Sequence, residues 1–208
     1  MDFNVSSKKE QRGILAGMLL GWGRKNGDNF FIQHSLPQEE YLLFKKNLLE
    51  GITRKPVSCD RKILKTGKIA IRIEPKLIPL TRILIKRLYR EENQSQKISR
   101  KFLDFLTLQG IAIWFMDKGS KSFKRRGDRI SALEIFLNTR TSQIESEIIT
   151  AYFAEVWDIH WGLSKTRNFY RLRLGTKAGK QFFALLLPYI HPSMLYKIET
   201  SYNTTATI

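Results

Sequence analysis

Basic side chains are the residues of this sequence with the clearest chemistry. The 208 residues include 36 Lys and Arg against 19 Asp and Glu, a formal net charge of +17. Arg171 and Arg173 alternate with Leu172 and Leu174. Because successive side chains along a strand point to opposite faces, this alternation predicts a strand with one basic and one apolar face. A surface of this kind binds polyanions, so the phosphates of a nucleic acid are the predicted ligand.

Residues that could hold a metal or act as a nucleophile are few. His34, His160 and His191 are scattered without the spacing of metal ligands, and Cys59 is the single cysteine. No phosphate-binding glycine loop and no dinucleotide fingerprint is present. The sequence therefore offers no cofactor site by motif.

A membrane surface is the other polyanion that a basic protein could bind, and the sequence argues against it. No apolar run reaches the roughly 18 residues of a membrane span, and the basic residues are spread over candidate strands. The first ten residues contain no apolar signal core. With a single cysteine, these features predict an intracellular protein of the bacterial cytoplasm or an organelle, not a secreted one.

Two apolar, helix-length runs, residues 13–23 and 109–119, organise the chain, and each stops at a glycine, as helices commonly do. In the first run glycines recur every four residues and form a stripe without side chains. Glycine inside a helix costs roughly 0.5–1 kcal/mol relative to alanine, so the stripe predicts close contact between two helix backbones. The predicted interface residues are Gly13, Ala16, Gly17, Gly21, Gly110, Ala112 and Ile113.

Residues 15–23, Leu-Ala-Gly-Met-Leu-Leu-Gly-Trp-Gly, resemble the LAGLIDADG motif of homing endonucleases. Residues 112–119, Ala-Ile-Trp-Phe-Met-Asp-Lys-Gly, resemble that family's Ala-Ile-Trp-Phe-Met-Asp-Asp-Gly version, and residues 182–197 resemble the end of its single-chain members. The resemblance implies an α+β fold of two pseudo-symmetric αββαββα halves. The motif helices would pack together at the centre, and two curved antiparallel sheets would form a nucleic-acid-binding saddle in a monomer.

The chain departs from the family at the positions that carry its chemistry. In the family, the acid before the last glycine of each motif binds the divalent metal that drives DNA cleavage. Those positions are Trp22 and Lys118 here, and neither an indole nor an ammonium group can ligate a metal. We therefore expect no catalytic residue, no metal and no cofactor.

Two acids remain as fallback ligands for a cleavage reaction, which would need carboxylates to hold its metals. Asp117 precedes the second acid position by one residue, and on a helix this turns its side chain by roughly 100° away from the site. Asp28 lies in a predicted loop. Mg²⁺ would be the cofactor only if these acids supported cleavage.

Local patterns predict the same order of elements twice. The first half has the motif helix, a basic loop at 24–28, a strand at 29–35, a helix at 37–49, a hairpin of 57–64 with 68–74, and a helix at 77–89. The second half has the motif helix, a basic loop at 121–129, a strand at 132–137, a helix at 141–156, a hairpin of 161–165 with 168–174, and a helix at 177–189. We predict halves at 1–92 and 102–208 joined by a polar linker at 93–101.

The basic residues of the predicted hairpins and loops form the predicted nucleic-acid-binding set. They are Arg24, Lys25, Arg61, Lys62, Lys65, Lys68 and Arg72 in the first half, and Lys124, Arg125, Arg126, Arg129, Lys165, Arg167, Arg171 and Arg173 in the second. Most would contact phosphates, and a smaller subset would read bases.

Three functions remain open from the sequence. Family members that lose both acids are similar to intron maturases, so the leading prediction is a splicing cofactor that binds a structured intron RNA. The second is a sequence-specific binder of double-stranded DNA without cleavage. The third is a homing endonuclease that retains metal-dependent cleavage through non-standard acids. Charge does not separate RNA from DNA, because both carry the same phosphates.

Overall fold

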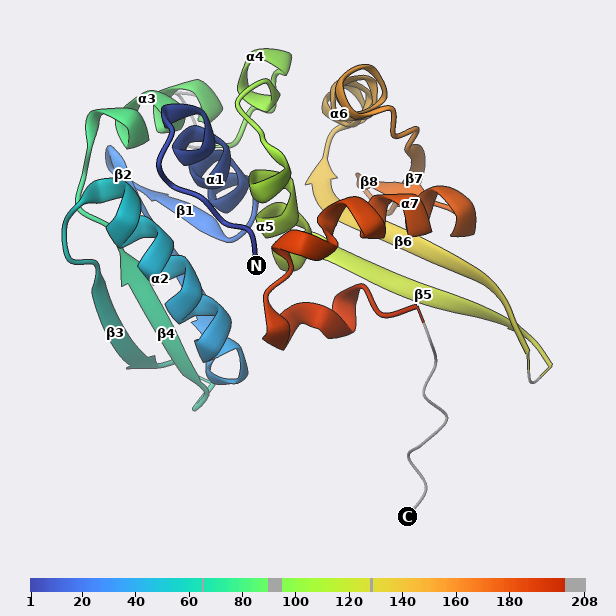
Figure 1. The fold of residues 1–208 in the computed structure, drawn as a ribbon, viewed down its shortest axis with the longest axis horizontal. Helices are drawn as coiled ribbons and strands as arrows, with labels where there is room; N and C mark the ends of the chain where they lie inside the picture. The colour runs from blue at the N-terminus through green and yellow to red at the C-terminus, as the bar shows by residue number, and fades with distance from the viewer. Residues whose placement is uncertain (65, 90–94, 128, 201–208) are drawn as a thin grey trace.

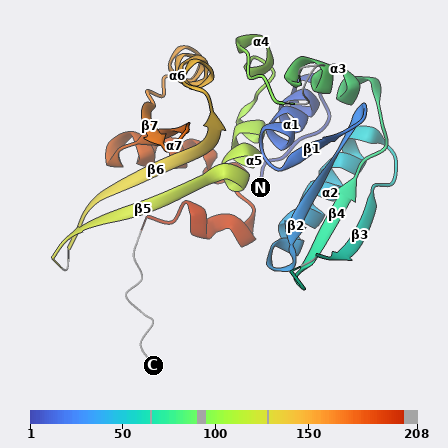
Figure 2. The same cartoon turned by 180° about the vertical axis from the view of Figure 1, so that it is seen from behind.

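A computed structural model describes residues 1–64, 66–89, 95–127 and 129–200. Each half carries a four-stranded antiparallel sheet, in the strand orders β1-β2-β4-β3 and β5-β6-β8-β7. Figure 1 shows the molecule from the helix side, with α1 and α5 between the two halves. Figure 2 shows the opposite side, where both sheets are free of helices; we call this side of each sheet its open face. The predicted α+β fold of two pseudo-symmetric halves is confirmed.

Apart from the segment that follows α1, the N-terminal half has the predicted order of elements. Its elements are α1 (Lys8–Leu20), β1 (Gly23–Asn26), β2 (Asn29–Ser35), the 3-10 helix η1 (Leu36–Gln38), α2 (Glu39–Thr53), β3 (Ser58–Ile63), β4 (Ile69–Glu74) and α3 (Pro79–Leu88). The Ser7 hydroxyl accepts a hydrogen bond from the Glu10 N–H and caps α1. Proline at the first position opens α3, where its fixed φ suits a helix and its missing N–H is not needed.

The C-terminal half repeats the order. Its elements are α4 (Arg100–Leu103), α5 (Leu108–Lys118), β5 (Gly119–Arg126), β6 (Arg129–Thr141), α6 (Gln143–Trp157), β7 (Gly162–Thr166), β8 (Phe169–Leu174), α7 (Thr176–Leu186), η2 (Leu187–Tyr189) and η3 (Pro192–Lys197). Ser142 and Glu145 form a reciprocal capping box at the start of α6. Helix α4 crosses the predicted boundary between linker and C-terminal half, and residues 93 and 94 of the linker lie outside the described residues.

The prediction of basic loops after both motif helices is wrong, because these segments are strands. β1 pairs with β2 from Gly23↔Ile32 to Asn26↔Asn29, and β5 pairs with β6 along its whole length. Both strands are rich in polar and basic residues, so neither has the apolar alternation by which a strand is recognised in a sequence. The basic residues placed in loops therefore have alternating directions, which decides which of them can reach a common ligand.

The central helices approach each other at their glycines. A Cβ atom added to Gly17 would lie 2.1 Å from the carbonyl oxygen of Gly110, and one added to Gly110 would lie 2.1 Å from the oxygen of Gly13. Ala112 and Ile113 are completely buried. The glycines thus allow a separation between α1 and α5 that larger residues would prevent.

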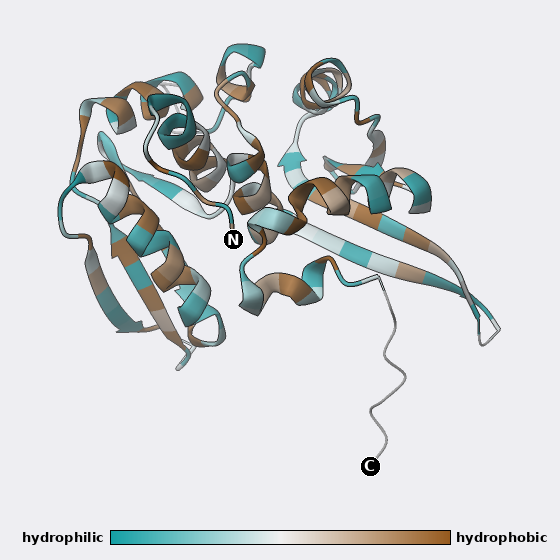
Figure 3. Ribbon diagram, in the orientation of Figure 1, coloured by the Kyte–Doolittle hydropathy of each residue, from teal (hydrophilic) through white to brown (hydrophobic). Residues whose placement is uncertain are grey.

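Each sheet buries its apolar face under helices. Ile71 and Ile73 of β4 and Leu172 of β8 are completely buried. Hydropathy colouring shows apolar residues concentrated along the central helices and on the strands beneath α2 and α7, while the far end of the β5–β6 hairpin is hydrophilic (Figure 3). Within the described residues, no helix has the length and apolar character that crossing a membrane requires.

Candidate nucleic-acid interface

The C-terminal ends of α1 and α5 bring Trp22 and Lys118 together. The Lys118 ammonium lies 3.6 Å from the centroid of the Trp22 ring, and the indole N–H donates to the backbone oxygen of Asp117 at 3.1 Å. A cation over an indole face is attracted by about 0.5–2 kcal/mol, depending on its solvation. The two positions that the resemblance assigns to metal-binding acids therefore hold a cation–π pair.

Asp117 lies behind this pair and is committed to contacts within the protein. Its Oδ2 accepts a hydrogen bond from the Trp22 N–H at 3.0 Å, and its Oδ1 lies 2.5 Å from the Lys45 ammonium. The space for its side chain exists because Gly21 has none, since a Cβ at Gly21 would lie 2.0 Å from Oδ2. Asp117 therefore fastens the end of α1 to α5.

A buried charged network surrounds Asp117, and the sequence analysis did not identify it. The side chains of Lys45 and Asp117 are completely buried, and the Lys45 ammonium also lies 3.1 Å from His34 Nε2. Because an ammonium only donates, Nε2 must accept, which leaves Nδ1 protonated and donating to Gln38 Oε1 at 2.8 Å. One signal was available: Lys45 lies in register with Tyr41, Leu42 and Leu48 on the buried stripe of α2.

Burial controls the titration of this network. Desolvation and then the Lys45 charge lower the pKa of His34 from 6.5 to about 4, although the Asp117 charge opposes this. Desolvation also lowers the pKa of Lys45, against the opposing effect of Asp117, and raises that of Tyr41. His34 is therefore neutral at physiological pH.

The low pKa of His34 predicts a loss of stability in mild acid. Unfolded chains bind a proton at His34 below pH 6.5, whereas the folded protein does so only near pH 4. The free energy of unfolding should therefore fall as the pH drops through this window, by up to about 3 kcal/mol. Urea titrations at several pH values would measure the slope. His34→Gln should flatten it, whereas a matched change in the exposed histidine, His160→Gln, should leave it unchanged; equal slopes in all three proteins would contradict the assignment.

The described residues around the helix ends do not fit a divalent metal. No group of three His, Cys, Asp or Glu side chains within the described ranges is arranged as a metal site. Burial lowers the pKa of Lys118; the Asp117 charge opposes this shift, and the charges of Arg140 and Arg24 add to it. Asp117, the one acid among these neighbours, is paired with Lys45. Asp28, the other fallback ligand, lies in the β1–β2 turn and pairs with Arg82 of α3 at 3.1 Å. A metal would face ammonium and guanidinium groups here.

The C-terminal segment adds another cation to these helix ends. Lys197 of η3 donates from Nζ to the backbone oxygen of Gly119 at 3.1 Å. Burial lowers its pKa from 10.5 to about 8, and repulsion from Lys45 and Lys118 contributes, while the Asp117 charge opposes the shift. The end of α5 is thus surrounded by lysines from three elements.

The open faces of the two sheets share one pseudo-symmetric feature. The Arg72 guanidinium lies 3.7 Å from the centroid of the Phe31 ring, and the Arg171 guanidinium lies 3.8 Å from that of Phe136. The strand registers show that these two pairs occupy equivalent places. The paired residues Gly23↔Ile32↔Ile73 in one sheet correspond to Gly119↔Leu137↔Leu172 in the other, and in both sheets the aromatic residue and the arginine each come one residue before the last two of these positions. Each open face therefore carries an arginine packed on an aromatic ring at the same place.

Strand register divides the predicted binding set between the two faces. Residues paired across neighbouring strands share a face, which places Arg24, Lys62, Arg72, Lys124, Arg171 and Arg173 on the open faces. Lys68 precedes β4, Arg167 lies in the β7–β8 turn, and Arg125, Arg126 and Arg129 lie at the end of the β5–β6 hairpin. Lys65 is outside the described residues.

Three members of the predicted set lie on the helix-covered side instead. Arg61 pairs with Glu39 of α2 at 2.7 Å, and Lys25 lies over the Tyr89 ring. Lys165 pairs in register with Tyr170, whose hydroxyl donates to Gln143 of α6. Each of these three positions is one residue out of phase with the open face, so its role in binding stays a prediction that the direction of its side chain does not favour.

Acidic residues on the open faces organise several of the arginines. Glu134 accepts from both Lys124, at 3.0 Å, and Arg173. The hydrogen bond from Lys124 lowers the pKa of Glu134. In the other sheet Glu74 lies 2.5 Å from the Arg72 guanidinium and accepts from Asn26. The open faces are therefore basic but carry specific acid partners that hold arginine side chains in place.

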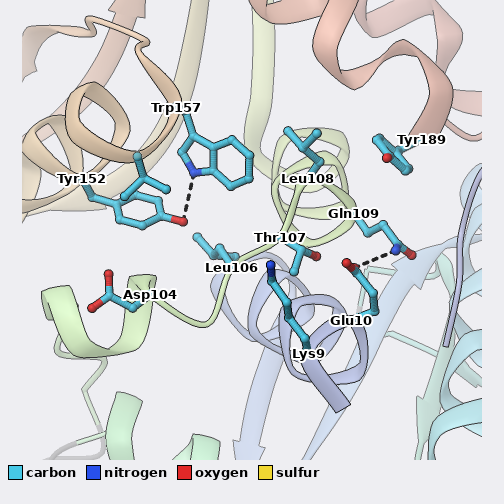
Figure 4. A pocket seen from close by; sticks show the side chains of 11 residues that line it. Lys9, Glu10, Asp104, Leu106, Thr107, Leu108, Gln109, Tyr152, Trp157 and Tyr189 are labelled. Carbon is cyan, nitrogen blue, oxygen red and sulfur yellow. Dashed lines mark hydrogen bonds between the residues drawn. The ribbon is translucent and has the colours of Figure 1, made fainter. Parts of the chain in front are cut away.

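A separate pocket lies at the opposite, N-terminal ends of the central helices (Figure 4). It has a volume of about 350 Å³ and lies between α1, the start of α5 and α6. Two pairs of its polar groups hydrogen-bond to each other: Gln109 donates to Glu10 at 2.6 Å, and the Trp157 indole donates to the Tyr152 hydroxyl at 3.0 Å. The buried Thr107 hydroxyl has no hydrogen-bond partner among the described residues. This pocket is remote from Trp22 and Lys118 and contains no member of the predicted binding set.

Comparison with known proteins gives the family. The model of the LAGLIDADG DNA endonuclease family matches residues 12–182. Protein RecA of Mycobacterium shimoidei is 26% identical over 228 residues, covering 96% of this chain and 48% of the relative. A second RecA, of Mycolicibacterium flavescens, gives the same figures, so the chain spans about half the length of the curated relatives it matches.

Solved structures agree on the fold. The homing endonuclease I-WcaI, bound to its DNA recognition sequence, superposes with a TM-score of 0.76 at 22% identity, covering 96% of this chain and 89% of that one. The N-terminal LAGLIDADG domain of WhiA superposes with a TM-score of 0.50 at 18% identity over 93% of this chain and 90% of that one. With its two motif helices packed at glycines between two antiparallel sheets, the chain belongs to the LAGLIDADG DNA endonuclease family.

Proposed function

We propose that this chain is a monomeric, intracellular LAGLIDADG protein that binds a nucleic acid on the open faces of its two sheets and does not cleave it by the family's metal-dependent chemistry. The observation that carries the proposal is the contact between Lys118 and Trp22 at the acid positions. A cation occupies the place where the family's reaction requires carboxylate-bound metal, while the basic open faces remain.

Loss of cleavage follows from the charge of the helix ends. Metal-assisted hydrolysis needs carboxylates that hold cations between the attacking and leaving oxygens. Lys118, Arg24 and Arg140 would repel such ions, and Asp117 has its two oxygens engaged by Lys45 and the Trp22 N–H. Incubation of the purified protein with Mg²⁺ and its retrieved target should leave the strands intact. Cleavage that Asp117→Asn abolishes would establish the nuclease alternative instead.

The biological role that we propose first is that of an intron splicing cofactor, which binds a structured intron RNA and stabilises its fold. The alternative is a sequence-specific binder of double-stranded DNA, and the DNA bound to the structurally similar I-WcaI favours it. Crosslinking in the native cell, followed by sequencing of both the RNA and the DNA recovered, separates the two. Enrichment of one intron RNA supports the first role, and enrichment of a short duplex DNA site supports the second.

The arginines of β8 test the binding surface. Arg171→Ala with Arg173→Ala should weaken binding to a mixed-sequence duplex by about 10–100-fold and reduce the salt dependence by about one ion per lost phosphate contact. Arg61→Ala is the matched control, because Arg61 lies on the opposite face and pairs with Glu39. Fluorescence anisotropy at several salt concentrations would measure both quantities. Equal loss in the control would place binding elsewhere on the molecule.

A further inference from the structure

A pocket of about 590 Å³ lies where the two halves meet, beside the C-terminal ends of α1 and α5. β1 contributes Arg24, the end of β6 contributes Arg140, and the helix ends contribute Trp22 and Lys118. Gln96 forms part of another wall, where its side chain donates to the Leu19 carbonyl and the Tyr89 hydroxyl. Lys25 of β1 is the fourth cation of the lining, and of these four only Arg24 and Lys25 belong to the predicted binding set.

The cations of this pocket lack acid partners among the described residues. Neither Arg24 nor Arg140 makes an ion pair with a described acid, and the Lys118 ammonium rests on the Trp22 ring. The described lining includes one carboxylate, that of Glu145, and its oxygens accept from Ser142 and from the Ile98 N–H as the cap of α6. The described lining therefore carries four cations against one carboxylate, and none of the four forms an ion pair with it.

Of the four cations that line the pocket, Arg24 and Arg140 lie close enough to Lys118 to repel it. Burial is the main cause of the lowered pKa of Lys118; the Asp117 charge opposes it, and Arg140 and Arg24 lower it further. An anion between these groups would replace repulsion by attraction. Lys118 is half-buried whereas Arg24 and Arg140 are exposed, so the contact with Lys118 is the one that weaker solvent screening strengthens.

Besides its cations, the pocket has an unusual backbone conformation at Arg140. Arg140 has φ of 54° and lies in the irregular part of β6, between the paired residues Leu137 and Thr141. This left-handed conformation is sterically unfavourable for a non-glycine residue. A bulge of this kind changes the direction of a side chain relative to a regular strand, and here the strand interruption brings Arg140 to the lining of the pocket.

We propose that this pocket binds a phosphate group of the nucleic-acid backbone directly, through Lys118, Arg24 and Arg140, without a divalent ion. This inference rests on the proposed function, because the phosphate belongs to the bound strand. Guanidinium groups match two phosphate oxygens at once, and an ammonium supplies a compact charge. The indole of Trp22 holds Lys118 at the edge of the pocket, so the pair at the former acid positions becomes a phosphate clamp.

A metal-free clamp makes a specific prediction about binding. Affinity for a mixed-sequence DNA duplex should be no weaker in EDTA than in Mg²⁺ at equal ionic strength. Lys118→Met and Arg140→Gln should each weaken binding about 3–10-fold, and the double variant should reduce the slope of log affinity against log salt by about one or two ions. Lys46→Met and Arg61→Gln are matched controls from the helix side and should change neither quantity.

The experiment separates failure of the clamp from failure of the proposed function. If the unaltered protein binds neither duplex DNA nor structured RNA, the proposed function is wrong. If it binds, and Arg171→Ala weakens binding while Lys118→Met and Arg140→Gln do not, the clamp alone is wrong. Binding that requires Mg²⁺ would also overturn the clamp. As a second measurement, tripolyphosphate in EDTA should shift the NMR signal of the Trp22 indole N–H, identified with Trp22→Phe, and Lys118→Met should abolish the shift.

Discussion

Replacing Lys45 by methionine is expected to lower the free energy of unfolding by about 3–5 kcal/mol, because it leaves the Asp117 carboxylate buried without its cation. The Lys45 ammonium and Asp117 Oδ1 are 2.5 Å apart, and both side chains are completely buried. Methionine restores the volume and the apolar stem but not the charge. His34 Nε2 would also lose its donor at 3.1 Å. Urea unfolding followed by circular dichroism would measure the change.

The neighbouring lysine provides the control for this experiment. Lys46 pairs with Glu50 one helical turn away at the edge of the core, so Lys46→Met should change the stability by no more than about 0.5 kcal/mol. Asp117, the partner of Lys45, provides a second comparison. Adding Asp117→Asn to Lys45→Met removes the uncompensated charge and should recover at least about 1–2 kcal/mol of the loss. Additive effects of the two substitutions would show that the ion pair is not what Lys45 contributes.

Gly17→Ala is expected to have the second large effect. The added Cβ would lie 2.1 Å from the carbonyl oxygen of Gly110, and this contact is with backbone, so no rotamer change can relieve it. One of the central helices must move, and the loss should reach or exceed about 3 kcal/mol, the upper end for overpacked cores. Thermal unfolding would measure it. At most helical positions, replacing glycine by alanine raises the stability by roughly 0.5–1 kcal/mol, so the expected loss at Gly17 is opposite in sign.

The same substitution elsewhere tests whether crowding is the cause. A Cβ at Gly162 of β7 would meet only the Arg173 oxygen at 3.7 Å, an ordinary contact. Gly162→Ala should therefore leave stability unchanged or slightly higher. If Gly17→Ala proves equally mild, the helices are not held at the separation that the glycines allow, and the central interface is more deformable than the structure indicates.

Lys45→Met and Gly17→Ala are also expected to affect the position of the binding surface. Trp22 and Lys118 occupy the C-terminal ends of the helices that Gly17 and Asp117 hold together. A shift between α1 and α5 would move β1 and β5 as well, since β5 continues directly from α5 and only Gly21 and Trp22 separate β1 from α1. Variants that remain folded should therefore be compared for nucleic-acid affinity only after their stability is known.

The central helices were predictable because their signals are local. Gly13, Gly17 and Gly21 recur at the spacing of one helix face, and that spacing is written in the sequence. The two motifs, at corresponding places in the two halves, led from this pattern to the correct fold. The same local reading found strand β2 and the β7–β8 hairpin, where apolar residues alternate with polar ones.

Strands β1 and β5 were missed because their sequences contain almost no apolar residues. The hydrogen bonds of β1 to β2 and of β5 to β6 make them strands, and the residues that supply those bonds lie on the partner strand. A strand that is stabilised mainly by backbone hydrogen bonds to its neighbour need not have a hydrophobic pattern in its own sequence.

The direction of each basic side chain was decided by register, which only the folded sheet determines. A shift of one residue moves a side chain to the other face, so Arg61 and Lys165 lie on the helix-covered side of their sheets although their neighbours Lys62 and Ser164 lie on the open faces. The sequence determined the family and the central glycines, and it places Trp22 and Lys118 where the resemblance assigns acids. Tertiary structure decided the burial of Lys45 against Asp117 and the convergence of Arg24, Lys118 and Arg140, because these contacts join residues that are far apart in the chain and meet only when both halves pack together.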